Sequence, residues 1–462
     1  MHCALLGGVT LAGAAHADEL SDLKQRIEQL EQRQPQPPSQ TPAPTTTGDA
    51  LTWRGVTLYG QVDLGVTYQS HATPLNQNYG LEYFVAKNSQ GARVSAAPNA
   101  LSASNIGLKG DINLMPGWNA VFKLESVFLP TSGQLVDPLK AVAQNNGVPL
   151  NQQTSNGDSS RAGQLFSNAA YVGLSSGKWG TATFGRQNSL GLDGIAAYDP
   201  QGGAPAFSLV GYQGATAGGG VTESARLDSA LKYRVAVGPV RVGALYQFGG
   251  SGNVPRGAWQ FNLGSDIGKL SVDAVYSKVY DAIAASTLSA AQTAVLPTNS
   301  LAGTISDNTA WMLMGKYNLG AVQLYAAGSR MEFANPSNPL SAGATAQGGY
   351  LLSAVTNNAF NNHKVLTVYW AGAKWQATPK LSVTGAYYHE NQNSFSGTGC
   401  NDTTLASCGG REDAFSVVGL YKFSDHWEGY AGAMVSHVAG GVASGFLHTS
   451  SVDPTIGARL RF

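Results

Sequence analysis

The chain has 462 residues, and its 28 Lys and Arg side chains balance its 28 Asp and Glu side chains, so the formal net charge is zero. Only 12% of the residues are charged, which argues against a nucleic-acid-binding protein, because such a protein needs a basic surface. The 57 glycines and 19 tyrosines favour strands and tight turns over helices. Beyond the amino-terminal segment, no apolar run reaches the roughly 18 residues of a membrane-spanning helix, so only a closed barrel could cross a bilayer.

Residues 1–17 have the pattern of a secretory signal peptide. An apolar stretch over residues 4–15 leads into Ala15-His16-Ala17, a small-x-small cleavage pattern, which predicts a mature protein that begins at Asp18. The basic residue that usually precedes the apolar stretch is missing, so either the start codon is misplaced or the signal is atypical. We expect Cys3 to be removed with this segment.

Residues 18–34 carry the clearest helical pattern. Apolar residues recur there at coiled-coil spacings, namely Leu20, Leu23, Ile27 and Leu30. A helix this short is unstable alone, so we expect a periplasmic coiled coil with identical helices. The alternative is an isolated helix packed on the periplasmic mouth of a barrel. The Pro-, Gln- and Thr-rich residues 35–50 then predict a semi-rigid linker without a core.

From residue 51 to residue 462 the pattern changes to period two, which indicates strands. In one such stretch Phe122 and Leu124 alternate with Lys123 and Glu125. One apolar face and one charged face are typical of a barrel with lipid outside and water inside, whereas the core of a packed sandwich would be apolar. Lys123 and Glu125 are neighbours on the same face, so we expect them to pair.

The alternating stretches number sixteen, joined in turn by short turns and long polar segments. Short periplasmic turns and long external loops are expected of outer-membrane barrels, and an even number of strands leaves both ends in the periplasm. The predicted fold class is all-β, a 16-stranded antiparallel transmembrane β-barrel with a short N-terminal helix. The predicted strands are 57–69, 102–114, 119–130, 166–176, 180–189, 228–238, 240–250, 257–268, 269–282, 309–320, 321–333, 365–378, 381–394, 413–425, 427–438 and 453–462.

Cys400 and Cys408 lie in one polar segment between two predicted strands. In an exported protein, two cysteines this close are expected to form a disulfide that staples the loop. A pair of free thiols is the alternative. A metal site is disfavoured, because nothing nearby supplies the remaining ligands. We expect no metal and no cofactor.

The last ten residues, 453–462, alternate to the carboxyl terminus. Ile456, Ala458 and Leu460 share one face with Phe462, and the opposite face carries Arg459 and Arg461. A chain that ends inside a strand on an aromatic residue, apolar on one face and charged on the other, suits the closing strand of a transmembrane barrel.

Several stretches, taken in order, resemble a known family. They are residues 57–63 (TLYGQVD), 104–110 (SNIGLKG), 170–174 (AYVGL), 184–187 (FGRQ), 228–233 (DSALKY) and the terminal Phe462. Residues 51–462 are similar to the trimeric general (non-specific) porins of Gram-negative outer membranes, and residues 18–50 lie outside that pattern. The resemblance implies a homotrimer. It also implies a partner role for Phe462, through which the barrel-assembly machinery would recognise the chain.

The resemblance further implies a third loop, here residues 190–227, that folds into the lumen and narrows it. Acidic groups of this loop would face basic groups of the wall. The candidates for this constriction are Arg186, Arg226, Lys109, Lys123, Glu125, Asp193, Asp199, Lys232 and Arg234. Alternation supports inward side chains for Arg226, Lys232 and Arg234. Arg186 has the parity of Phe184, so an inward Arg186 requires a bulge at Gly185 or a twist at the strand end.

Two positions depart from the family pattern. The family commonly has arginines where this chain has Asn105 and Asn168. The loss of positive charge would weaken a preference for anions, so the sequence leaves ion selectivity open. Each inward charge also has an ordinary alternative role, which is to solvate the lumen or to pair with a neighbour.

About sixteen tilted strands close at a diameter that side chains cannot fill, which leaves an aqueous channel. We therefore expect passive diffusion of small hydrophilic solutes and ions through an outer-membrane channel in contact with lipid and lipopolysaccharide. A substrate-selective channel for a sugar, phosphate or organic acid is the closest alternative. A hydrolase is disfavoured, because His389 with Glu390, and His363, come without a nucleophile motif. An adhesin that binds through its long loops is a third alternative.

Overall fold

The computed structural model describes residues 45–47, 50–157, 162–211, 225–249, 257–345, 347–396, 400 and 405–462. The predicted signal peptide (1–17) and coiled-coil helix (18–34) lie outside these residues. At the end of the predicted linker, β1 (Thr45–Thr47) pairs antiparallel with β2 (Ala50–Trp53), which pairs in turn with β3. The described end of the predicted linker is therefore extended and pairs with the first barrel strand through β2. Threonine is β-branched and favours the extended conformation, which suits residues 45–47 to pairing with a neighbouring strand.

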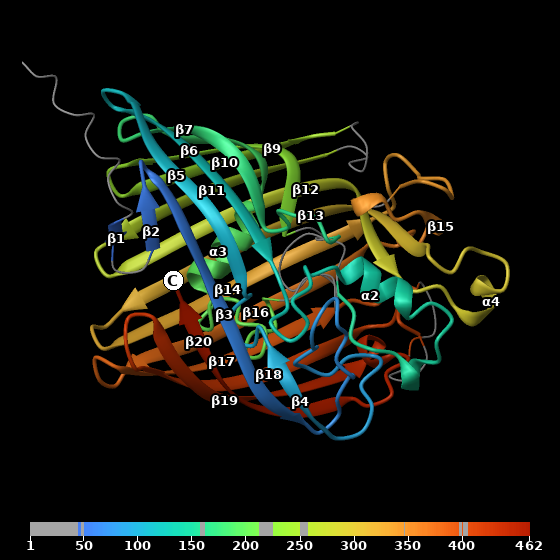
Figure 1. Cartoon of the computed structure of the whole chain (residues 1–462). Helices are drawn as coiled ribbons and strands as arrows, with labels where there is room; N and C mark the ends of the chain where they lie inside the picture. Colours follow the sequence, from blue (N-terminus) through green and yellow to red (C-terminus); the bar gives the residue numbers. More distant parts are fainter. Residues whose placement is uncertain are drawn as a thin grey trace, which may run out of the picture.

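A closed antiparallel barrel forms the body of the described chain (Figure 1). Each strand pairs with the next along the chain, and β20 pairs with β3 to close the cylinder. Within the described residues the barrel has sixteen strands: β3 (Val56–Gln69), β5 (Asn105–Met115), β6 (Trp118–Val127), β7 (Ala169–Ser176), β8 (Gly180–Asn188), β9 (Arg226–Val237), β10 (Val240–Phe248), β11 (Gly257–Ile267), β12 (Leu270–Ser286), β13 (Leu301–Asn318), β14 (Val322–Ala334), β16 (Lys364–Gln376), β17 (Leu381–Gln392), β18 (Gly410–Lys422), β19 (Trp427–Gly440) and β20 (Ser450–Arg461).

Each of these strands overlaps one predicted strand, so the fold class is confirmed. The largest differences are in β12 and β13, which extend four and eight residues beyond the predicted ends at 282 and 309. A register shift between Val279 and Ala282 separates this extension from the rest of the hairpin. Most of the added residues are small or polar, and only Ile283, Leu301 and Ile305 are large and apolar, so the period-two pattern did not reveal them.

Side chains alternate between the outer surface and the lumen. On β10, Tyr246 is 50% exposed on the outside, whereas its neighbours Leu245 and Gln247 are buried inside. On β20, Ile456 faces outward, while Arg459 and Arg461 both form ion pairs with Glu428 of the adjacent strand. The predicted division into an apolar and a charged face is therefore confirmed at the terminal strand.

Short turns gather at one end of the barrel and long loops at the other (Figure 1). The carboxyl terminus lies at the short-turn end, where the Arg461 amide donates to the carbonyl of His426, a turn residue, at 2.8 Å. The long loops hold the remaining elements, which are β4 (Arg93–Pro98), α2 (Pro138–Gln144), η1 (Leu150–Gln152), α3 (Leu190–Tyr198), α4 (Ala290–Thr293), η2 (Gln347–Gly349), β15 (Leu352–Thr356) and η3 (Gly441–Ala443). No described helix has the length and hydropathy needed to cross a membrane.

Two long loops fold inward and form the main buried cluster with the barrel wall. Tyr83 and Phe84 come from loop 1 (residues 70–104), and Phe207 comes from loop 3 (residues 189–225). They are buried in one cluster with wall residues such as Trp370 and Tyr388. The Val85 amide of loop 1 also donates to Ser436 Oγ on β19 at 2.8 Å. The apolar core of this protein therefore lies between the inner wall and the two loops, and these loops narrow the lumen.

Candidate functional site

Loop 3 begins with a capped helix that lies inside the barrel (Figure 1). Ser189 caps α3, since its hydroxyl accepts a hydrogen bond from the Leu192 amide at 3.0 Å. The Leu190 amide donates to Gln260 Oε1 on β11 at 2.6 Å. Helix α3 packs against β8 and against β10, β11, β12, β13 and β14. The expected inward fold of the third loop is therefore present.

Hydrogen bonds to the opposite wall hold the end of α3. Tyr388 on β17 donates its hydroxyl to Asp199 Oδ1 at 2.6 Å, and the Gly203 amide donates to Asp199 Oδ2 at 2.6 Å. Trp370 on β16 donates its indole N–H to the Tyr198 carbonyl at 3.2 Å. Asp199 is only 3% exposed, and burial raises the pKa of its carboxyl group. Asp199 thus fastens the loop, and it does not face the basic wall as the sequence suggested.

Beyond Asp199, loop 3 continues to β18 and β19. Ser416 donates its hydroxyl to the Phe207 carbonyl at 2.6 Å, and the Phe207 ring packs edge-on against Tyr430 with a centroid distance of 6.2 Å. The Ala206 amide donates to the Ala100 carbonyl of loop 1 at 2.8 Å. Loop 3 therefore spans the lumen from β8 to β19.

The acidic side chain at the start of α3 faces two basic side chains of the wall. Asp193 Oδ2 lies 2.8 Å from Lys232 Nζ and 2.6 Å from Arg234 Nη2, both on β9. Asn188 also donates to Asp193 Oδ1 at 3.2 Å. These contacts fix the acidic group of the loop against the basic wall.

A second charged group lies on β5 and β6. Lys123 Nζ is 3.0 Å from Glu125 Oε2, which confirms that these same-face neighbours pair. Tyr59 donates its hydroxyl to the same carboxylate at 2.6 Å, and Asn168 donates to its other oxygen. Lys109 and Lys123 place their ammonium groups 5.1 Å and 5.7 Å from the centre of the Tyr59 ring, within cation–π range.

One cavity of about 270 Å³ joins the two charged groups. Lys123 borders it from β6, Lys232 and Arg234 border it from β9, and Asp193 borders it from α3. With Lys109 and Glu125 beside it, four basic and two acidic side chains surround this cavity. We call these six residues the constriction cluster.

The two remaining predicted arginines lie outside this cavity. Arg186 forms an ion pair with Asp228 at 2.5 Å, donates to the Ser167 carbonyl at 2.9 Å and is 7% exposed. A register shift between Gly185 and Gln187, where Gly185 has a φ of +131°, forms the bulge that an inward Arg186 requires. Its charge is therefore buried against a carboxylate and does not face the open lumen.

Arg226 lines an adjacent cavity of about 300 Å³ together with Leu192 and Ile195 of α3. Asn188 borders both this cavity and the cavity of the constriction cluster. Arg226 therefore lies beside the cluster, at the root of loop 3, where it pairs in register with Asn188 of β8.

Sequence reasoning missed three polar contributors to the site. Asp228 has the parity of Lys232, so alternation along β9 could have identified it as the partner of Arg186. Tyr59 on β3 contributes both the hydroxyl that donates to Glu125 and the ring beside Lys109 and Lys123. Arg241 on β10 donates to Asp273 Oδ2 at 2.9 Å and to the Tyr198 hydroxyl at 3.1 Å, which fastens α3 to the wall. Nothing in the sequence indicated this contact, because it depends on the path of the loop.

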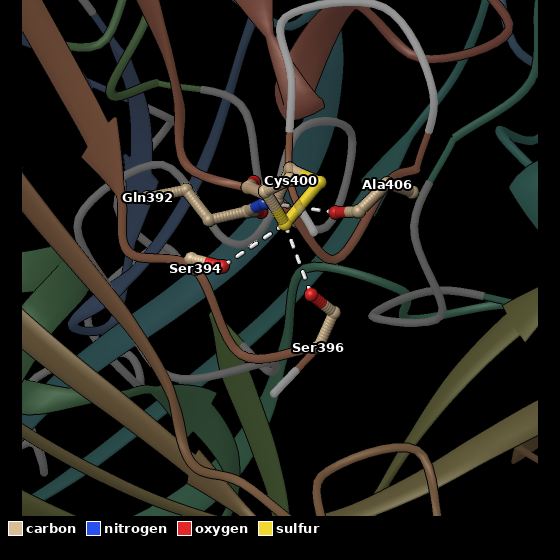
Figure 2. Close-up of a disulfide and its surroundings, with 6 residues drawn as sticks. Gln392, Ser394, Ser396, Cys400 and Ala406 are labelled. Carbon is tan, nitrogen blue, oxygen red and sulfur yellow. Dashed lines mark hydrogen bonds between the residues drawn. A yellow bond between two sulfur atoms is a disulfide. The ribbon is translucent and has the colours of Figure 1, made fainter. Parts of the chain in front are cut away.

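Outside the lumen, a disulfide joins Cys400 and Cys408, the two cysteines expected to pair (Figure 2). Ser394 and Ser396 place their hydroxyl oxygens 3.0 Å and 2.9 Å from the Cys400 sulfur. The Gln392 side chain donates to the carbonyls of Ala406 and Cys408, at 2.8 Å each. The disulfide closes the loop onto the end of β17. Among the described residues, no group of three or more His, Cys, Asp or Glu side chains is arranged to hold a metal ion.

The chain matches known proteins in sequence and in fold. The family described as Gram-negative porin matches residues 3–440. An outer membrane porin protein of Bordetella pertussis is 29% identical over 190 residues, a match that covers 40% of this chain and 40% of that protein.

Solved structures show the same fold at low sequence identity. The anion-selective porin from Comamonas acidovorans is 16% identical, with a TM-score of 0.59 over 88% of this chain and 99% of that chain. A trimer form of OmpT, an outer membrane protein of Vibrio cholerae, is 14% identical, with a TM-score of 0.53 over 88% of this chain and 99% of that chain.

Proposed function

This chain belongs to the Gram-negative porin family, and we propose that it forms a water-filled outer-membrane channel for passive diffusion of small hydrophilic solutes and ions. Family membership locates the protein in the outer membrane and identifies it as a porin rather than an enzyme. In the proposal, the long-loop end faces the exterior, and solutes pass the constriction cluster on their way to the short-turn end.

The main support for this proposal is the contact of Asp193 with Lys232 and Arg234 of β9. An acidic group on an inward loop opposite Lys232 and Arg234 produces a transverse field across the lumen beside α3. Such a field orients dipolar solutes and disfavours apolar ones. The cluster holds four bases and two acids, so we propose a modest preference for anions. Partly solvated charges of this kind contribute about 1 kcal/mol or less, so the result is a bias and not a strict gate.

Reversal potentials in a KCl gradient across planar bilayers test the proposed selectivity. The wild-type channel is expected to favour chloride, and Lys232→Gln combined with Arg234→Gln should shift the reversal potential toward potassium. Lys380→Gln with Lys178→Gln is the matched control, because both lysines lie in short turns away from the cluster. Equal shifts in the two double variants would exclude the constriction cluster as the source of selectivity.

A substrate-selective channel is the second candidate. A cavity lined by phenylalanine and lysine side chains at the long-loop end favours it. Solute flux into proteoliposomes separates the two functions. Flux that rises linearly with concentration supports general diffusion, and flux that saturates supports a binding site on the path.

We also propose that the protein assembles as a homotrimer in contact with lipid and lipopolysaccharide, with Phe462 as the recognition element for the barrel-assembly machinery. The trimer form of OmpT is similar in fold. The coiled coil predicted for residues 18–34 would also join three chains. Light scattering of the detergent-solubilised protein measures the number of chains, and a monomer would exclude this assembly.

A further inference from the structure

A third cavity, of about 500 Å³, lies at the long-loop end of the barrel. Loop 1, the loop that carries α2, the outer ends of β12 to β14 and the loop after β19 all contribute to its lining. It shares no lining residue with the cavity of the constriction cluster. Its volume is within the range of small-molecule sites in proteins, which is roughly 300–1,000 Å³. We call it the vestibule cavity.

Aromatic rings form one side of the vestibule cavity. Phe333 and Phe360 line it with a ring-centroid distance of 5.7 Å, and Phe360 packs in turn against Phe395 at 6.0 Å. Phe84 and Phe446 also belong to the lining. A porin lumen is expected to be polar, so grouped phenylalanines at the mouth provide an apolar surface that a flat ring could contact.

Two lysines lie among these rings. Lys364 places its ammonium group 5.2 Å from the centre of the Phe333 ring, and it also interacts electrostatically with Glu390 of β17. Lys87 is exposed at the rim and forms no ion pair within the part of the chain that the structure describes. Ammonium groups beside an aromatic surface are suited to a ligand that combines a ring with a negative charge.

Besides the aromatic rings and the lysines, the vestibule cavity has a buried carboxyl group. Glu82 lines the vestibule cavity, is 5% exposed, and accepts a hydrogen bond from the Asn156 amide at Oε1. Among the described residues, its Oε2 atom has no hydrogen-bond partner. Burial raises the pKa of Glu82 to about 7. An unsatisfied buried oxygen is costly, so a ligand that donates a hydrogen bond to it would be favoured.

We propose that the vestibule cavity binds a small hydroxylated aromatic carboxylate. The ring lies against Phe333 and Phe360, the carboxylate contacts Lys87 and Lys364, and the hydroxyl group donates to Glu82. The phenylalanines, the lysines and Glu82 each contact a different group of the ligand. An analogue that lacks one of these groups therefore tests one set of residues. This binding is distinct from diffusion through the channel. Folded protein should bind the ligand even under conditions in which no ion current flows.

Isothermal titration of the folded, detergent-solubilised protein with para-hydroxybenzoate tests this site. We expect trans-4-hydroxycyclohexanecarboxylate, which keeps the charge and the hydroxyl group but lacks the aromatic ring, to bind at least about tenfold more weakly. Benzoate, which lacks the hydroxyl group, should bind about threefold to tenfold more weakly. Equal affinity for all three acids, or no binding by protein whose barrel is shown to be folded by circular dichroism, would overturn the proposal.

Variants locate the binding. Lys364→Gln and Lys87→Gln should each lower the affinity for para-hydroxybenzoate about fivefold to tenfold. Lys87 is exposed, so its variant retains the fold and keeps the test valid if Lys364→Gln misfolds. Lys232→Gln is the control, because it belongs to the constriction cluster, and it should leave the affinity unchanged. If Lys232→Gln alone weakened binding, the ligand would lie at the constriction and the vestibule proposal would fail, whereas the channel proposal would stand.

Discussion

Gly60 and Phe462 exchange two backbone hydrogen bonds of 3.0 Å and so join the first barrel strand to the last residue of the chain. A β-carbon at Gly60 would lie 2.5 Å from the Phe462 ring and 2.7 Å from the Asn105 carbonyl oxygen. The missing side chain at Gly60 therefore makes room for the terminal ring on the outer surface of the seam. Closure removes the free edges that an open sheet would expose to lipid.

Gly60→Ala should destabilise the barrel at this seam. Overpacking of this kind costs about 1–3 kcal/mol, so the unfolding temperature in detergent is expected to fall. Gly177→Ala is the matched control, because a β-carbon there meets no atom within 4 Å. An unfolding temperature that falls equally in both variants would show that the Phe462 ring does not require the glycine.

Asp193→Asn should increase the preference for anions. The substitution removes the loop carboxylate that pairs with Lys232 and Arg234 and keeps a side chain of similar size. Loss of roughly 0.4–1 kcal/mol of electrostatic interaction corresponds to an increase of about twofold to fivefold in the chloride-to-potassium permeability ratio. Reversal potentials measure this ratio. Asp425→Asn, in an exposed turn, is expected to change nothing, and a shift toward potassium in Asp193→Asn would contradict the proposed role.

Glu82 should make the packing of loop 1 depend on pH. Burial raises its pKa from 4.5 to about 7, so its contribution to stability is present below about pH 4.5 and is lost as the pH rises through about 7. Hydrogen exchange of the amides of Leu81 and Val85 should therefore be faster at about pH 8 than at about pH 5, after correction for intrinsic rates. Glu82→Gln should remove most of this difference. An undiminished difference in the variant would assign the pH dependence to another group.

Loss of the disulfide should loosen one loop and leave the barrel intact. Cys400 and Cys408 are eight residues apart, and closing a loop of this length corresponds to about 2.5 kcal/mol of chain entropy. The variant with both cysteines replaced by serine should be cleaved faster by protease between β17 and β18, with an unchanged barrel unfolding temperature. Ser394→Ala, which removes a hydroxyl next to the Cys400 sulfur, is the control and should be cleaved at the wild-type rate.

The strands could be predicted because the outer and inner sides of the barrel favour different residue types, and both sides contribute to the sequence of every strand. Phe122 and Leu124 face outward while Lys123 and Glu125 face the inside of the barrel, and a period of two follows from that geometry. The same alternation predicted the Lys123–Glu125 ion pair and the need for a bulge beside Arg186. Local sequence is sufficient for these features, because the partners are neighbours on one strand or on adjacent strands.

The path of the loops could not be predicted from alternation. Asp199 was expected to face basic groups, but it is buried against Tyr388, which is 189 residues away in the sequence. Arg186 was expected at the constriction, but Asp228 neutralises it. The vestibule cavity depends in the same way on contacts among loops, such as the Leu447 amide that donates to the Lys87 carbonyl at 3.0 Å. Such contacts require the whole barrel to be assembled first.

The barrel should enclose a continuous aqueous path past the constriction cluster. Single-channel recording of the purified mature protein in planar bilayers tests this claim most directly. We predict discrete conductance steps in KCl that rise with salt concentration and persist at low voltage. Protein that inserts into the bilayer with a folded barrel and yet produces no conductance steps would contradict it.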